Sequence, residues 1–126
     1  MREIKFRGKR KDNGEWVEGH YAKIAVNFGQ NDVIIEQTKG GSFVPQFIDI
    51  KTLGQFTGLL DKNGKEIYEG DVIQDNNYKD EMAVMKWDDK KAQLATDLPI
   101  GWFWSKMERI EVIGNIHDNP ELMKLK

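Results

Sequence analysis

The segment of residues 61–73 constrains the fold more than any other part of the chain. Its Asn63-Gly64 pair supplies two residues that tolerate positive φ, as a type I′ hairpin turn requires. Glu69-Gly70-Asp71 then interrupts the strand, and the apolar pair Val72-Ile73 predicts a new strand that enters a core. The segment therefore predicts a tight hairpin, a bulge and the first strand of a further β structure.

Composition sets the size and the environment of the protein. The chain has 126 residues, 39% of them hydrophobic and 32% charged, which predicts one compact globular domain or two small β units that share a core. Cysteine is absent, and this excludes disulfides, thiolate nucleophiles and Cys-ligated zinc. The apolar runs are too short to span a bilayer, and no apolar signal core follows the basic N-terminus. We therefore expect a cytoplasmic protein that makes no membrane contact.

The first half of the chain, residues 1–60, is expected to form an N-terminal β region. Its predicted elements are a short strand around Ile4 and Phe6, a hairpin turn at residues 11–15, and either one strand over residues 16–28 that bends at Gly19 or two short strands there. Residues 30–32 are expected to form a loop. Pro45 lacks an N–H donor and predicts an edge strand or a bulge, and Asp49 is expected to cap one helical turn over residues 50–53.

The second half, residues 61–126, has the strand spacing of a small barrel. Short strands are predicted at residues 71–74, 82–87, 93–96 and 110–116, with a polar loop through Asp80 after the first. Asp118 or Asn119 followed by Pro120 predicts a short C-terminal helix. The predicted fold class is mostly β: an N-terminal antiparallel sheet or meander packed on a C-terminal SH3-like small β-barrel, with that helix at the end.

Several motifs along the chain resemble one family. They are the opening residues 1–7, residues 55–59, the segment of residues 61–73, and Val112-Ile113-Gly114-Asn115-Ile116 with Asn119-Pro120-Glu121-Leu122. Together they are similar to the YopX family of phage and prophage proteins over nearly the whole chain. The resemblance implies a mostly β protein made in a bacterial host cell, encoded by a phage or an integrated prophage, with no established biochemical activity.

The sequence contains no recognisable catalytic pattern. Its two histidines and two serines stand in no nucleophile motif, and no phosphate-binding loop is present. Five carboxylates are candidates for a Mg²⁺ cluster in a metal-dependent phosphodiesterase: Glu69, Asp71, Asp75, Asp88 and Asp89. Turn formation explains them without a metal, since acidic residues collect at hairpin ends. We therefore expect no catalytic residue, no metal site and no cofactor, and rank the phosphodiesterase third.

A cluster of aromatic residues is the first candidate for a binding surface. Trp102, Phe103 and Trp104 follow Gly101, and strand alternation sends Phe103 to the side opposite the two tryptophans. They either seal the end of the barrel or form a contact surface for a protein, for which tryptophan is enriched. The leading hypothesis is a non-enzymatic binding or assembly module: an accessory phage or prophage protein that forms a homo-oligomer or binds a phage or host protein.

The basic N-terminal strand supports nucleic-acid binding as the alternative. Residues 1–24 carry seven basic and four acidic side chains, a local charge of +3, whereas residues 61–91 carry −3. The candidate contact residues are Arg2, Lys5, Arg7, Lys9 and Arg10, with Trp16 as a stacking platform. A pI near 5.7 is far from the basic character that phosphate neutralisation favours, and lysines also protect strand edges from pairing. Nucleic acid is therefore the less favoured partner.

Overall fold

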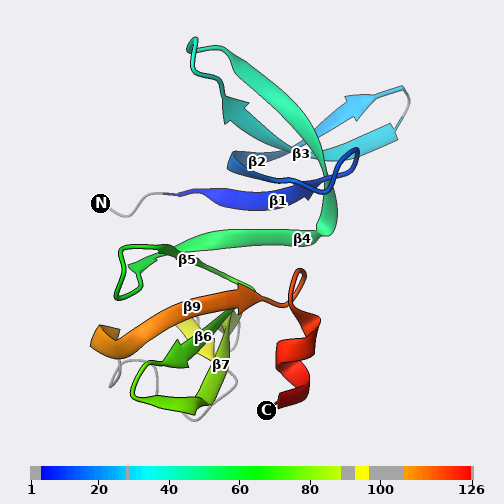
Figure 1. The fold of residues 1–126 in the computed structure, drawn as a ribbon. Coiled ribbons are helices and arrows are strands. Elements are labelled where there is room, and N and C mark those ends of the chain that lie inside the picture. The colour runs from blue at the N-terminus through cyan, green and yellow to red at the C-terminus, as the bar shows by residue number, and fades with distance from the viewer. Residues whose placement is uncertain (1–3, 28, 89–92, 97–106, 126) are drawn as a thin grey trace. The chain divides into compact units, whose positions relative to one another are not determined.

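The structure of the protein is a computed structural model that describes residues 4–27, 29–88, 93–96 and 107–125. It is mostly β, as predicted, and the pairings between its strands are antiparallel (Figure 1). The elements in chain order are β1 (Phe6–Arg10), β2 (Trp16–Val26), β3 (Gly29–Gln37), β4 (Phe43–Leu60), β5 (Glu66–Tyr68), β6 (Asp71–Asp75), β7 (Tyr78–Asp88), β8 (Gln93–Thr96), the 3₁₀ helix η1 (Met107–Arg109), β9 (Ile110–Asn115) and the 3₁₀ helix η2 (Pro120–Leu125).

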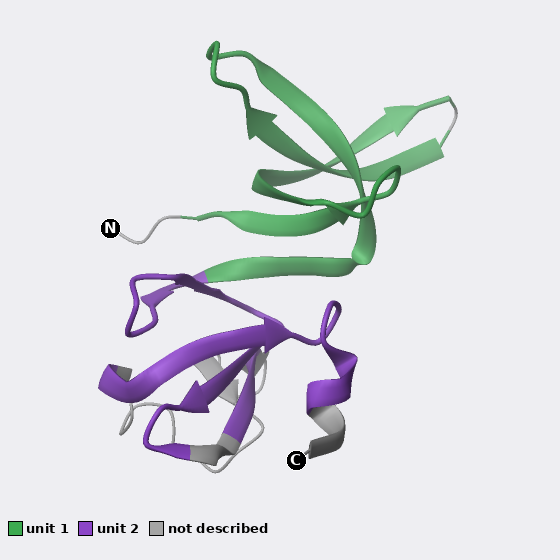
Figure 2. Cartoon of the chain, viewed as in Figure 1, with its two compact units in different colours: residues 1–56 green, residues 57–126 purple. Residues whose placement is uncertain are grey.

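The chain divides into two compact units, residues 1–56 and residues 57–126 (Figure 2). The division falls within β4, the longest strand, whose last residues belong to the second unit. In the described part of the chain, neither 3₁₀ helix has the length and apolar character needed to cross a bilayer.

The strand pairings of the first unit close on themselves. Residues 16–19 of β2 pair with β1, and residues 20–26 pair with β3. In the same way, residues 43–47 of β4 pair with β3, whereas residues 48–55 pair with β1. Each long strand therefore bridges two neighbours, and the ring β1-β2-β3-β4 encloses a small core of Val17, Ile34 and Ile48, with Phe6, Tyr21 and Leu53 packed against it.

The helical turn predicted over residues 50–53 is wrong, because β4 runs through this segment as a bulge. The register moves from Arg7↔Gly54 to Lys9↔Asp49, so that Gly8 alone faces residues 50–53. The Thr52 hydroxyl donates to the Asp49 carbonyl oxygen at 2.6 Å and accepts from the Lys9 N–H at 2.8 Å. The polar residues that resemble a helix cap in sequence instead hold the bulge against β1.

Two further predictions for the first unit have different outcomes. The loop predicted at residues 30–32 is wrong: these residues lie in β3, where Gln30 pairs with Ala25 and Asp32 with Lys23. Cross-strand pairing extended the strand past a polar segment that suggested a turn. Pro45 lies as predicted on an edge, since in the described registers its part of β4 pairs only with β3.

In the second unit, β6, β7, β8 and β9 form a sheet in the order β8-β7-β6-β9, and β5 pairs with β4. The core consists of Ile67, Ile73, Ala83, Met85, Ile110 and Val112. Val72 and Ile73 are fully buried, as predicted. The described pairings do not confirm an SH3-like barrel. The polar loop predicted through Asp80 is too long, because β7 already begins at Tyr78.

The turn predicted at Asn63-Gly64 is present, but it is not type I′. The Asp61 N–H donates to the Lys65 carbonyl at 2.8 Å, and the Gly64 N–H donates to the Asp61 carbonyl at 3.0 Å. Gly64 has a φ of 82°, whereas Asn27 is the only non-glycine residue of the described chain with positive φ. This is a three-residue loop in which Gly64 forms a G1 bulge. The prediction failed because Asp61 fixes Asn63 through its own carboxylate, which accepts the Asn63 N–H at 2.8 Å.

The chain ends in the 3₁₀ helix η2, a correction to the C-terminal helix expected from sequence. Its start is held by two asparagines. Asn119 Oδ1 accepts the Asn115 N–H at 3.2 Å, and the Asn119 N–H donates to the Asn115 carbonyl at 2.9 Å. Asn115 Oδ1 also accepts the N–H groups of His117 and Asp118 at 3.0 and 2.9 Å. These hydrogen bonds give the asparagines of the C-terminal motif a structural role.

Candidate binding face of the first unit

The residues singled out from sequence are only partly within the described structure. Trp102, Phe103, Trp104 and Arg2 lie outside the described residues. The other basic candidates, Lys5, Arg7, Lys9 and Arg10, lie on or just before β1, and Trp16 begins β2. They therefore belong to the first unit, and their geometry can be compared with the nucleic-acid interpretation.

The structure brings Arg7, Lys9 and Trp16 together on one face of the β1–β2 pair. The Arg7 guanidinium lies 4.6 Å from the centre of the Trp16 ring, and Lys9 Nζ lies 5.4 Å from it. Lys9 is the cross-strand partner of Trp16, so the stacking follows directly from the register. These cation–π contacts already use a ring that the sequence suggested as a stacking platform for bases.

Arg10 and Lys5 also have partners within the first unit. Arg10 donates to both carboxylate oxygens of Asp12, at 3.0 and 2.7 Å. These hydrogen bonds raise the pKa of Arg10 and lower the pKa of Asp12. Lys5 Nζ lies 3.9 Å from the Glu18 carboxylate and 5.1 Å from the centre of the Phe56 ring. The basic strand is thus interleaved with carboxylates and aromatic rings.

Two of the acidic residues considered for a metal site, Asp71 and Asp75, lie apart and make hydrogen bonds within the second unit. Asp71 and Asp75 are both buried, at opposite ends of β6. Asp71 Oδ2 accepts the Tyr68 N–H at 2.7 Å, and Asp75 pairs with Arg109 at 3.2 Å. Asp89 lies outside the described residues. Across the residues that the structure describes, no three acidic or histidine side chains come together in a group that could hold a metal ion.

The sequence interpretation missed an apolar face on β4. Phe43, Pro45 and Phe47 alternate along the strand and point to the same side. The side chains of Phe43 and Phe47 are 64% and 45% exposed. Their partners in β3 on this face are Gln37, Ile35 and Val33, of which Val33 is fully buried, so the exposed part of the face is carried by β4. We call the three β4 residues and these three β3 residues the β3–β4 face; its sequence signal was the spacing Phe-x-Pro-x-Phe.

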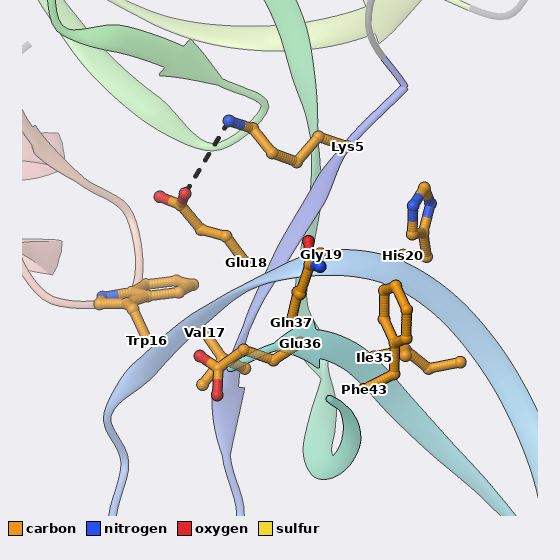
Figure 3. A pocket seen from close by; sticks show the side chains of 10 residues that line it. All are labelled: Lys5, Trp16, Val17, Glu18, Gly19, His20, Ile35, Glu36, Gln37 and Phe43. Carbon is orange, nitrogen blue, oxygen red and sulfur yellow. Dashed lines mark ion pairs between the residues drawn. The ribbon is translucent and has the colours of Figure 1, made fainter. Parts of the chain in front are cut away.

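A first hollow lies at the Phe43 end of the β3–β4 face, where β2 leaves β3 (Figure 3). Here β2 passes so close to β3 that a Cβ at Gly19 would lie 2.1 Å from the Ile35 carbonyl oxygen, which only glycine permits. Beyond Gly19, β2 pairs with β1, and a space of about 490 Å³ opens. It is lined by Lys5, Trp16, Val17, Glu18, Gly19, His20, Ile35, Glu36, Gln37 and Phe43.

A second hollow, of about 350 Å³, lies at the Phe47 end of the same face, where β4 leaves β3. The Lys11 N–H donates to the Phe47 carbonyl at 2.9 Å and brings the β1–β2 turn alongside β4. The lining residues are Arg10, Lys11, Asp12, Asn31, Pro45, Gln46 and Phe47. Both hollows fall in the size range of ligand and side-chain binding sites.

The edge of β4 beside this face is poorly suited to pairing with another strand. Pro45 has no N–H to donate, and the Phe47 carbonyl already accepts from Lys11. Backbone addition of a foreign strand therefore has few groups to use. Contact with the β3–β4 face has to be made through side chains, above all through the rings of Phe43 and Phe47.

Fold and face together define a small, mostly β protein with an exposed apolar face flanked by two hollows. The chain belongs to the YopX family, since the family model described as YopX protein matches residues 5–124. Among solved structures it is similar to the crystal structure of protein EF1440 from Enterococcus faecalis, with a TM-score of 0.63 and 24% identity; the match covers 98% of this chain and 99% of that chain. That likeness shows the fold alone. The search of curated proteins found no match.

Proposed function

We propose that this protein is a non-enzymatic assembly module, an accessory protein of phage or prophage origin, that works by docking protein through the β3–β4 face. The observation that carries the proposal is the exposure of Phe43 and Phe47 on one side of a strand, each beside a hollow. An aromatic ring flanked by a concavity is a common anchor arrangement in protein interfaces. Large exposed aromatic side chains lower the solubility of a protein, and a partner that covers Phe43 and Phe47 explains why they are exposed.

The polar groups around the face favour protein over nucleic acid. The first hollow carries Glu18 and Glu36 with only Lys5 to balance them, and such a site repels a phosphate backbone. Arg7 and Lys9 are engaged with Trp16 instead of pointing into that hollow together. Nucleic-acid binding by the basic strand is accordingly the weaker proposal, and a metal-dependent phosphodiesterase is weaker still.

The proposal is tested by affinity capture from a bacterial host that carries the active phage, with the tagged full-length chain as bait. The test variant replaces both rings, Phe43→Ser with Phe47→Ser. The control is Ile50→Ser, which removes an apolar side chain with the same 45% exposure as Phe47 from the bulge of the same strand. We expect proteins captured by the wild type and the control to be lost with the double variant. Equal capture by all three baits would contradict docking through this face.

A further inference from the structure

We propose that the occupant of the β3–β4 face is a second copy of this chain, docked face to face about a two-fold axis that passes near Pro45. The inference rests on the proposed function, because it names the partner of the same face. It specifies the symmetry of the dimer, the contacts between the two copies and their relative orientation. In this arrangement the ring of Phe43 in one protomer covers Phe47 in the other and fills the partner's second hollow.

The positions of the two rings fit a self-complementary interface. Phe43 and Phe47 are four residues apart on one strand, which corresponds to about 13 Å. Pro45 lies midway between them. A two-fold axis at the midpoint exchanges the two ends, so each ring meets the hollow at the opposite end of the partner's face. Within the part of the chain that the structure describes, no side chain fills either hollow, and the second copy supplies one.

The charges of the two hollows also match in this orientation. The first hollow is lined by Lys5, Glu18 and Glu36, and because Glu36 pairs with Val44, on the side of β3 away from Phe43, Glu18 is the acidic side chain beside this face. The second is lined by Arg10, Lys11 and Asp12, a net charge of +1. A two-fold axis at Pro45 places Glu18 of one protomer against the positive end of the other. A parallel arrangement would instead set like charges together, which is unfavourable.

Glu18 and Lys11 are the side chains best placed to make this charge contact. Glu18 is 53% exposed on the rim of the first hollow, and its pairing with Lys5 is long, at 3.9 Å. Lys11 is exposed on the rim of the second, where only its backbone N–H is committed to Phe47. Arg10 and Asp12 largely neutralise each other through their two hydrogen bonds, which leaves Lys11 as the source of the positive charge.

Pro45 lies near the two-fold axis and also determines that the two copies associate through side chains and not through backbone pairing. Two edge strands related by a two-fold axis would normally extend their sheets by backbone pairing. Proline at the centre of the segment removes the central donor, and Lys11 occupies the Phe47 carbonyl. The copies therefore meet through the rings on the face and do not form a continuous sheet.

Sedimentation equilibrium of the purified full-length chain tests the inference. We expect a monomer–dimer equilibrium in the micromolar range for the wild type. Phe43→Ser with Phe47→Ser should raise the dissociation constant of the dimer by about tenfold or more, since each protomer loses two rings that the dimer would bury. Ile50→Ser should leave it unchanged. Far-ultraviolet circular dichroism checks that all three proteins are folded. A wild type that stays monomeric throughout would overturn the inference.

Charge reversal tests the orientation separately. Glu18→Lys alone and Lys11→Glu alone should each raise the dissociation constant about three- to tenfold at low salt, because like charges then face each other across the axis. The combined variant restores opposite charges and should return to within about threefold of the wild type. Additive losses in the combined variant would overturn the antiparallel arrangement.

The two experiments separate the inference from the proposed function. If the wild type is monomeric and host capture still depends on Phe43 and Phe47, the face binds a different protein and only the self-association is wrong. If the chain dimerises through these rings and captures nothing else, the second copy is the partner. If neither measurement responds to the ring substitutions, both proposals fall together.

Discussion

Asp61 Oδ2 accepts the backbone N–H of Val112 at 3.0 Å, across 51 residues of sequence. On the same carboxylate, Oδ1 accepts the N–H groups of Asn63 and Lys65 at 2.8 and 2.9 Å. The next residue, Lys62, donates its N–H to the Ile110 carbonyl at 2.9 Å. The Asp61 side chain thus shapes the hairpin loop and attaches the loop to β9. There the loop makes hydrogen bonds of the kind that a neighbouring strand would make.

Asp61→Asn should destabilise the second unit. The substitution turns one acceptor oxygen into an NH₂ group that faces an N–H donor, and a buried donor without a partner costs about 1–3 kcal/mol. Urea unfolding at neutral pH measures the loss in free energy of unfolding. Asp12→Asn is the control, because Asp12 lies in a comparable but exposed turn, and we expect it to leave stability unchanged. An unaltered urea midpoint for Asp61→Asn would mean that the Val112 contact is dispensable.

The contribution of Asp61 should also depend on pH. Burial alone would raise the pKa of this carboxyl, but the N–H donors of Val112, Lys65 and Asn63 outweigh burial and lower the pKa below its ordinary value of 3.8. A carboxyl with a lowered folded pKa stabilises the protein above its unfolded pKa and loses this effect as pH falls through the folded pKa. The wild type should therefore keep a constant advantage over Asp61→Asn down to about pH 4, then lose it. Urea unfolding of both proteins across this range gives the difference; a gap that does not narrow in acid would argue against the assignment.

Gly70→Val should impair folding. Gly70 has a φ of 91°, which β-branched residues rarely adopt, and strain of this kind costs about 1–3 kcal/mol. Relaxation is opposed by two backbone hydrogen bonds, from the Gly70 N–H to Met85 at 2.8 Å and from the Ile116 N–H to Gly70 at 3.0 Å. Soluble yield and thermal unfolding report the effect, with Gly40→Ala as the control, because Gly40 is exposed and its own φ is not positive. A Gly70→Val protein as stable as the wild type would show that this corner tolerates a side chain.

The sequence predicted local structure better than the contacts between distant segments. Asn63-Gly64 and Val72-Ile73 were interpreted correctly as a turn and a buried strand start, because each depends on neighbouring residues. The ring of the first unit depends on the pairing of Phe6 with Gln55, whose register no local pattern encodes. For the same reason the polar segment at residues 49–53 suggested a helix: Asp49 accepts local hydrogen bonds from Lys51 and Thr52, but the sequence does not reveal the bond from the Lys9 N–H to Thr52 that ties the segment to β1.

The candidate site shows the same limit. Arg7, Lys9 and Trp16 were singled out from sequence as nucleic-acid contacts, but their mutual stacking follows from the β1–β2 register, which the sequence did not specify. The alternation of Phe43, Pro45 and Phe47 was visible from the start. Exposure, however, depends on which neighbours cover a strand face, and alternation alone does not distinguish a covered face from an open one.

We expect the protein to show no salt-sensitive binding of nucleic acid. Arg7 and Lys9 are held over Trp16, and Glu18 and Glu36 line the adjacent hollow. Filter retention of labelled single-stranded DNA and RNA at about 50 mM salt is the measurement, since electrostatic binding is strongest at low salt. Retention by the wild type that disappears in Arg7→Gln with Lys9→Gln would instead establish the basic strand as a nucleic-acid interface.

Arg109→Met should destabilise the second unit through Asp75. The Asp75 carboxylate is fully buried, and the Arg109 Nε and terminal amino group donate to its two oxygens at 3.2 and 3.3 Å. Removing the cation leaves a buried negative charge, but Arg109 is 37% exposed and solvent already screens the pair, so we expect a loss of about 1–3 kcal/mol. Asp75→Asn combined with Arg109→Met should recover part of that loss, because the buried charge is then gone.

Arg10→Met is the control, since it breaks a similar two-pronged pair on the exposed surface and should leave stability unchanged. Urea unfolding of the wild type and the three variants measures the free energy of unfolding. Equal losses for Arg109→Met and the combined variant would show that the packing of Arg109, and not its charge, stabilises this part of the second unit.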